Sequence, residues 1–312
     1  MDRLTENKII LIVRKTRLDD LMARFNTEAQ ARFYIEHLGA DFSDYQRERR
    51  NYQNAVQEAQ LILSRLGRVQ IVDRSYVPNF IFGESDTIVI LGQDGLVANV
   101  LKYLSRQPIV GVNPDPRRWD GVLLPFVVAD LPKIIPEIFK GRRQIRLITM
   151  AKAELNTGQS LHGVNDLFIG PKSHTSALYS LQIGEMSEQH SSSGIIVSTG
   201  LGSTGWLRSI IAGATGIAAH LAGEKPIAPP KKLMEWEAEF LHFSVREPWP
   251  SKNSSAEITF GEITRDQPLL LVSHMPENGV IFSDGIEKDF MEFNSGARAT
   301  ITVAEKQGHI VV

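Results

Sequence analysis

A buried strand that runs directly into a glycine turn and a helix constrains the fold of this chain more than any other segment. Ile88–Leu91 is a run of four apolar residues, followed by Gly92–Gly95, which reads Gly-Gln-Asp-Gly. Apolar residues at positions 96, 97, 100, 101 and 104 then fit one face of a helix. A strand, a glycine turn and a helix form half of a nucleotide-binding unit. Such a turn gathers backbone N–H groups and the positive end of a helix dipole where a phosphate binds.

The acid inside this turn needs an explanation, because a carboxylate repels a phosphate. Two functions would account for Asp94: it accepts a proton from a hydroxyl group, or it binds a ribose hydroxyl. The structural alternative is an aspartate that caps the following helix. The segment alone leaves these interpretations open.

The composition argues against several classes of protein. A net charge of −2 gives no indication of nucleic-acid binding, and the absence of cysteine excludes disulfides and thiolate metal sites. The lack of cysteine also fits a reducing compartment, so we expect a cytoplasmic protein. No apolar run approaches the ~18 residues of a membrane span, and the eight histidines have no metal-ligand spacing.

The order of the predicted elements divides the chain into two domains, 1–126 and 127–312. In the first, strands and helices alternate, which predicts a Rossmann-like α/β domain with a parallel sheet; the strands are 8–13, 69–72, 88–91 and 108–112, and the helices about 28–38, 45–66 and 96–104. The second is rich in strands with turn signals, which predicts an all-β-rich sandwich. Its strands are 144–154, 161–169, 177–183, 195–198, 238–245, 256–260, 268–273, 280–283, 298–303 and 310–312. One helix, about 203–221, and a surface loop, 223–232, interrupt them, and the last residues are expected to pack on the first domain.

A second stretch repeats the logic of the first. The buried strand 195–197 leads into Ser198–Gly205, a turn of Ser, Thr and Gly apart from one leucine, and a helix then begins. Hydroxyls and free N–H groups at a helix start bind phosphate or ribose, and Trp206 offers a ring for stacking on a base or nicotinamide. The alternatives are a helix cap for Ser203 and Thr204, and core packing for Trp206.

Two further polar features stand close to apolar strands. Asn165 and Asp166 interrupt an apolar stretch, which is costly unless they have partners; an Asn can bind the edge of adenine and an acid can accept from ribose hydroxyls. A turn at this point is the alternative. Asn113 follows the fourth strand, at the sheet edge expected to carry the Gly92–Gly95 turn. The basic segment 14–17 follows the first strand there, where it would face an anion or form a solvated loop.

Together these stretches resemble the NAD kinase family. That family carries a Gly-Gly-Asp-Gly turn, an Asn-Glu pair, a Ser/Thr/Gly-rich turn and a late Asp-Gly, and this chain has counterparts in the same order. They are Gly92–Gly95, Asn165-Asp166, Ser198–Thr204 and Asp284-Gly285. Segments 111–116, 168–170, 192–194 and 245–248 are similar to the mitochondrial branch of the family.

The resemblance implies a kinase that uses ATP and a divalent cation such as Mg²⁺ to phosphorylate the adenosine ribose 2′-hydroxyl of NAD. It also implies a homodimer or homotetramer. From charge, hydropathy and histidine spacing we expect no nucleic-acid or membrane partner and no metal held by the protein alone. Asp94 matches the general base. The residues expected to bind NAD or ATP are Gly92, Gln93, Gly95, Asn113, Asn165, Asp166, Thr199, Ser203, Thr204 and Trp206.

Three departures from the family pattern leave alternatives open. Gln93 replaces a glycine where a phosphate would approach closely, and Asp166 replaces a glutamate with a longer side chain. Leu201 and Gly205 differ from the commoner Thr and Ala. A homologue that binds the nucleotide without catalysis is one alternative, and a kinase of another acceptor, such as a lipid, is the second. The retained acid favours an active NAD kinase, because the reacting group is the first requirement of the chemistry.

Overall fold

The computed structural model describes residues 4–225, 228, 233–287 and 289–312, so most of the expected loop 223–232 lies outside the described residues. The chain forms two compact units. Unit 1 comprises Met1–Arg146 with His309–Val312, and unit 2 comprises Leu147–Gly308. The C-terminal residues thus belong to the first unit.

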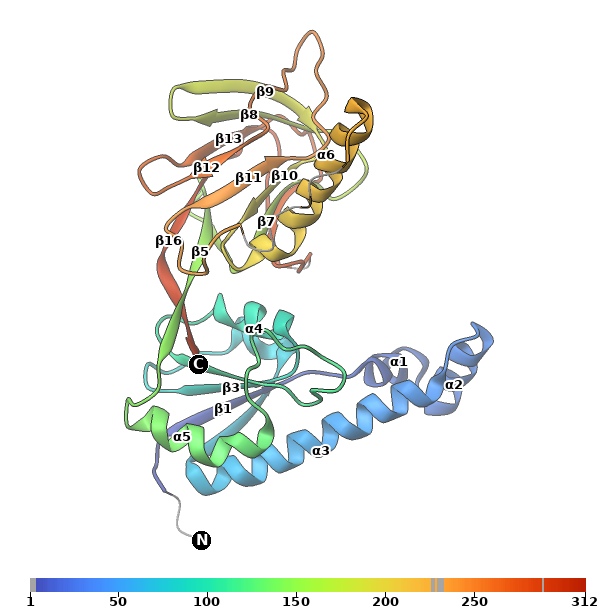
Figure 1. The fold of residues 1–312 in the computed structure, drawn as a ribbon, viewed down its shortest axis with the longest axis vertical. Helices are drawn as coiled ribbons and strands as arrows, with labels where there is room; N and C mark the ends of the chain where they lie inside the picture. Colours follow the sequence, from blue (N-terminus) through green and yellow to red (C-terminus); the bar gives the residue numbers. More distant parts are fainter. Residues whose placement is uncertain (1–3, 226–227, 229–232, 288) are drawn as a thin grey trace. The chain divides into compact units, whose positions relative to one another are not determined.

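Unit 1 is built on a parallel sheet, as the sequence predicts (Figure 1). Its strand order is β2-β1-β3-β4, and the end of β16 adds to β4. The bounds are β1 Lys8–Val13, β2 Arg68–Asp73, β3 Thr87–Leu91, β4 Pro108–Val112 and β16 Arg298–Val311. β3 is buried along its whole length, which explains its unbroken apolar sequence. Because the pairing is parallel, the carboxyl ends of β1, β3 and β4 lie at one edge of the sheet.

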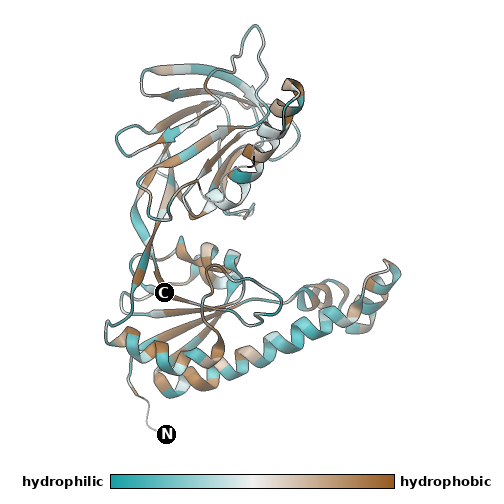
Figure 2. Ribbon diagram, viewed as in Figure 1, coloured by the Kyte–Doolittle hydropathy of each residue, from teal (hydrophilic) through white to brown (hydrophobic). Residues whose placement is uncertain are grey.

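Five helices and two short 3₁₀ helices complete the described part of unit 1. They are α1 Arg17–Phe25, α2 Glu28–His37, α3 Phe42–Leu66, α4 Asp94–Leu101, α5 Leu131–Phe139, η1 Arg74–Asn79 and η2 Val128–Asp130. The sequence analysis missed α1 and α5. In Figure 2 the strands of this sheet are largely brown and much of α3 is teal, as expected for a helix that covers the sheet with one face only.

The sequence analysis divided the chain at residue 126, whereas the first unit continues to Arg146. The reason is α5, which packs on α3 and buries Leu131, Ile134 and Ile135 in the core of unit 1. Two prolines inside this short segment, Pro132 and Pro136, obscure its helical pattern in the sequence.

Unit 2 contains two antiparallel sheets. One has the order β12-β11-β10-β7-β14-β15, and the other contains β16, β13, β8 and β9 with β5 and β6. The bounds are β5 Ile145–Leu155, β6 Ser160–Gly163, β7 Asp166–Pro171, β8 Ala177–Ile183, β9 Met186–Ser192, β10 Ile195–Ser198, β11 Leu241–Val245, β12 Phe260–Ile263, β13 Leu269–Ser273, β14 Gly279–Ser283 and β15 Phe290–Glu292. One buried cluster joins Leu167 and Phe243 of the first sheet to Tyr179 and Leu271 of the second. The predicted sandwich is therefore confirmed.

Among the described residues of unit 2, one α-helix covers the outer face of the first sheet. It is α6 (Trp206–Ala222), preceded by the 3₁₀ turn η3 (Gly202–Thr204), and it packs through Trp206 and Ile210 on Phe168 and Ile196 (Figure 1). The helix predicted at 203–221 is thus confirmed, with a break at Gly205.

Several strands of unit 2 differ from the prediction. The predicted strand 161–169 is two strands, β6 and β7, separated by a bend at Val164 and Asn165. Segments 298–303 and 310–312 belong to one long strand, β16, and the strand expected at 256–260 begins only at Phe260. β9 was missed because its sequence, Met-Ser-Glu-Gln-His-Ser-Ser, is polar. None of the described helices is long and apolar enough to cross a membrane.

Candidate functional site

The turn after β3 has an ordinary backbone, including at the position that departs from the family. Gln93 is the residue before the first turn of α4, with φ −123° and ψ 163°, so a side chain there causes no strain. A Cβ at Gly92 would lie 2.7 Å from a methyl carbon of Leu96, whereas a Cβ at Gly95 would have no atom within 4 Å. A side chain at 92 would therefore displace the Leu96 methyl group, whereas open space remains over Gly95 at the start of α4.

Asp94 does not cap α4. It is the first helical residue, and its Oδ1 accepts a hydrogen bond of 2.6 Å from the backbone N–H of Leu123. No described residue binds Oδ2. The carboxylate is therefore held by one oxygen and leaves the other available.

The loop after β4 carries Leu123, and its shape depends on Asn113. The buried Asn113 side chain donates to the carbonyl of Trp119 at 2.9 Å and accepts from the N–H of Asp115 at 3.0 Å. Gly121 has φ +66°, and a Cβ there would lie 2.7 Å from the Asn113 side-chain nitrogen. Asn113, predicted to bind a ligand, thus folds the loop that reaches Asp94.

The basic segment after β1 is neutralised by α3. Arg14 and Arg17 bind the buried Glu48 at 3.1 and 2.6 Å. A hydrogen bond from Arg118, and to a lesser extent one from Arg17, holds the pKa of Asp44 well below its ordinary value. The arginines of this segment are therefore ion-paired within the protein.

In unit 2, Asn165 lies in the bend between β6 and β7, and Asp166 is the first residue of β7. The turn alternative is thus correct for the backbone, and Asp284 stabilises it. One Asp284 oxygen accepts from the N–H groups of Val164, Asn165 and Asp166 at 3.0, 2.6 and 3.4 Å. Asp284 has φ 55°, an uncommon conformation that places its carboxylate against these amides.

The hydroxyls of the Ser/Thr/Gly turn fold the turn against this bend. Thr199 donates from its hydroxyl to the carbonyl of Val164 at 2.6 Å and from its N–H to that of Asn165 at 2.9 Å. Ser203 donates to the carbonyl of Gly200 at 2.8 Å, and Thr204 to that of Leu201 at 3.4 Å. Neither hydroxyl caps α6, whose preceding residue is Gly205.

Two polar groups of the Asn-Asp pair have no partner among the described residues. No described residue binds the side-chain amide of Asn165, and Oδ1 of Asp166 is buried without a hydrogen-bond partner. Burial raises the pKa of Asp166 to about 7, against the opposing effect of a hydrogen bond from Ser198 and with a smaller contribution from the nearby Asp284. A buried orphan oxygen beside a free amide indicates a ligand site in unit 2.

Trp206 both packs and lines a hollow. Its ring stacks on Phe168 with centroids 6.1 Å apart, and the Arg246 guanidinium lies 5.5 Å from the Trp206 centroid. The adjoining hollow, about 610 Å³, is also lined by Lys172 and Phe290. Packing and ligand binding are therefore compatible at this residue.

No protein-family model and no curated protein matches this sequence. Among the solved structures that match it, two NAD(H) kinases cover nearly its whole length. An NAD kinase from Archaeoglobus fulgidus in complex with ATP has a TM-score of 0.56 and 15% identity, covering 98% of this chain and 93% of that chain. A yeast NADH kinase complexed with NADH has a TM-score of 0.58 and 15% identity, with 99% and 84% covered. This chain has the NAD kinase fold.

The NAD kinase fold confirms what the resemblance implied about architecture; the mitochondrial branch and the residue roles remain predictions. Two residues of the site were not among the predicted ligand contacts. Leu123 acts through its backbone, for which the sequence has no signal. Asp284 is marked by the Asp-Gly pair, a sequence suited to a turn with positive φ.

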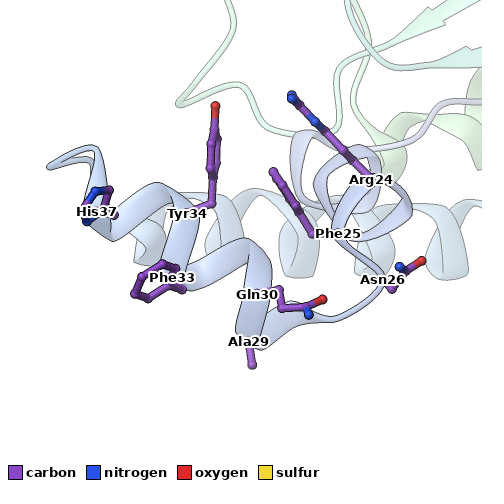
Figure 3. Close-up of a pocket in the computed structure, with 8 residues that line it drawn as sticks. All are labelled: Arg24, Phe25, Asn26, Ala29, Gln30, Phe33, Tyr34 and His37. Carbon is purple, nitrogen blue, oxygen red and sulfur yellow. The ribbon is translucent and has the colours of Figure 1, made fainter.

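A separate hollow in unit 1 lies between α1 and α2 (Figure 3). Its lining includes Phe25, Phe33 and Tyr34, and none of the predicted site residues takes part. Among the described residues, no group of three or more His, Cys, Asp or Glu side chains could hold a metal ion.

Proposed function

We propose that this chain is an NAD kinase, which transfers the γ-phosphoryl group of ATP to the adenosine ribose 2′-hydroxyl of NAD and yields NADP and ADP. The fold shared with two solved NAD(H) kinases supports the proposal, and so does the retention of an acid in the turn after β3. Because fold alone does not determine function, the residues must carry the argument.

The observation that carries it is the state of Asp94. One carboxylate oxygen is fixed by the N–H of Leu123 at 2.6 Å, and the other has no partner among the described residues. A general base needs a fixed orientation and one free acceptor within hydrogen-bond reach of the proton it removes. Asp94 meets both requirements, and it does not cap α4.

In the proposed reaction, Asp94 accepts the 2′-hydroxyl proton as the ribose oxygen forms a bond to the γ-phosphorus. The bond between that phosphorus and the β,γ-bridging oxygen breaks, and ADP leaves. The N–H groups at the start of α4 would bind phosphate, with open space over Gly95 for its approach. Mg²⁺ carried by ATP would neutralise the phosphates.

The nucleoside would be held by the Asn-Asp pair of unit 2. The free amide of Asn165 can donate to and accept from an adenine edge, and the orphan oxygen of Asp166 can accept from a ribose hydroxyl. The hollow beside Trp206 offers aromatic rings and the two cations Lys172 and Arg246, which suits the planar rings and phosphates of a dinucleotide.

One coupled assay tests the proposal: NADP formation from NAD and Mg-ATP, read out by an NADP-specific dehydrogenase. NADP formation that depends on both substrates supports an NAD kinase. NAD binding by calorimetry without NADP formation would instead support a nucleotide-binding protein that lacks catalysis. No binding of NAD at all would refute the proposal.

A further inference from the structure

The orientation of Asp94, which follows β3, depends on a loop that follows a different strand, β4. Leu123, which donates to Asp94, belongs to the segment 113–123 after β4. If this segment shifts, the N–H of Leu123 leaves the carboxylate, and the side chain of Asp94 is free to rotate. What fixes segment 113–123 therefore determines the orientation of Asp94.

Segment 113–123 is held partly by hydrogen bonds within itself. Asn113 bonds to the backbone of Asp115 and Trp119 and so closes the first half of the segment. These bonds define the shape of the turn, and backbone bonds of Phe126 to Asn113 and Gly111 hold its two ends beside β4. A second set of contacts holds its middle, residues 115–118.

The second set comes from α3. Arg118 makes a two-point ion pair with Asp44, at 2.9 and 2.6 Å, and Asn51 donates to the Asp115 carboxylate at 3.0 Å. Asp44 and Asn51 are two turns apart on α3. The segment is thus fastened to the helix at two points, and the fork of an arginine fixes direction as well as distance.

The same helix is also fastened to the strand that precedes Asp94. The hydroxyl of Tyr52 donates to the carbonyl of Leu91 at 2.9 Å and accepts from the N–H of Arg14 at 2.8 Å. Burial raises the pKa of Tyr52 to about 12, so the hydroxyl keeps its proton and remains a donor. α3 therefore bridges the two pieces of backbone that meet at Asp94.

We propose that Arg118 is a positioning residue for Asp94: by pairing with Asp44 it fastens segment 113–123 to α3 and keeps the N–H of Leu123 on the carboxylate. This inference rests on the proposed role of Asp94 as the base. Arg118 itself has no contact with Asp94, so its effect is on the orientation of the base and not on NAD binding.

The size of the expected effect follows from the geometry. A displacement of about 1 Å at the reacting group can cost roughly 100-fold in rate. By contrast, a partly exposed ion pair contributes little to folding; the Arg118 side chain is 22% exposed. Loss of Arg118 should therefore change turnover much more than stability.

The test compares Arg118→Ala with Arg49→Ala in the full chain. Arg49 pairs with Asp19 at 2.7 Å and joins α3 to α1, so it is a similar surface pair that does not touch segment 113–123. We expect Arg118→Ala to lower kcat about 10- to 100-fold with KM for NAD within about 3-fold, and Arg49→Ala to change neither. Arg118→Lys, which keeps the charge but not the fork, should recover part of the loss.

A second readout does not need activity. Hydrogen exchange of the peptide that contains Leu123 should become faster in Arg118→Ala and in Asn51→Ala, but not in Arg49→Ala. Unchanged exchange, or an unchanged kcat in an active enzyme, would overturn the positioning role. Absence of NADP formation by the unmodified protein would instead refute the proposed function, while the exchange measurement would still decide whether Arg118 holds the segment.

Discussion

The carboxylate of Asp284 accepts a 2.6 Å hydrogen bond from the backbone N–H of Asn165, 119 positions earlier in the chain. The bond joins the end of β14 to the bend before β7 and explains why the backbone leaves the sheet at that point. It also uses the backbone N–H of Asn165 and leaves its side chain free. The candidate ligand groups of unit 2 are therefore displayed by a bend that a distant acid holds in place.

The same bend is closed on its other side by Gly202, which gives a test of packing. A Cβ at this position would overlap the carbonyl oxygen of Asn165 and lie 2.8 Å from Oδ1 of Asp166. We expect Gly202→Ala to displace the bend and to weaken NAD binding at least 10-fold, measured by calorimetry. Its matched control is Gly213→Ala in the exposed interior of α6, where a Cβ meets no atom within 4 Å. That variant should gain about 0.5–1 kcal/mol of unfolding free energy, and equal effects of the two variants would contradict this account.

The elements that the sequence predicted well are those whose pattern is set locally. β3 is buried on both faces, so its apolar run is unambiguous, and the glycines that follow it mark the turn. β9 and α5 escaped prediction because tertiary contacts override their local signal: β9 is polar yet completes a hairpin with β8, and α5 contains two prolines yet packs on α3.

The same distinction between local and tertiary signals applies to the candidate site. Side chains whose type suggests a chemical role, such as Asp94 and Asn165, could be proposed from residue type and neighbouring sequence, and their roles stay predictions. The partners that orient them could not. Leu123 acts through its N–H and lies 29 positions after Asp94, and Arg118 reaches Asp44 across 74 positions. Only the fold brings such residues together.

Asp166 predicts a dependence of stability on pH. Burial raises its pKa from the ordinary value of 3.8 to about 7 in the folded protein, so the folded state binds more protons than the unfolded state between these values. Stability should therefore fall as pH rises from about 4 to about 7 and change little from this group above that range. Asp166→Asn cannot ionise, so its stability relative to the unmodified protein should rise across the same window. Urea unfolding at pH 4.5, 6 and 8 measures this, and a parallel course of the two curves would disprove the shift.

We expect replacement of Gln93 to have only a mild effect on folding and turnover. Its backbone is extended, and its side chain makes no capping bond to α4, so the fold does not depend on it. We expect Gln93→Gly to preserve or raise kcat with Mg-ATP, because a phosphate could then approach the backbone of the turn more closely. A loss of more than 10-fold, together with a higher KM for ATP, would show that the Gln93 amide donates to a phosphate.

The strongest prediction concerns Asp94. Asp94→Asn preserves the shape of the side chain, and its amide oxygen can still accept from the N–H of Leu123, but no oxygen remains to take a proton. We expect kcat to fall by about 100- to 10,000-fold while the affinity for NAD stays within a few-fold.

The matched control is Asp130→Asn, since Asp130 also accepts from a backbone N–H, that of Val127 at 2.9 Å, without belonging to the turn. Steady-state NADP formation and calorimetry with NAD separate the two effects. Retained turnover in Asp94→Asn would remove Asp94 as the base, and a loss of NAD binding would assign it to substrate binding instead.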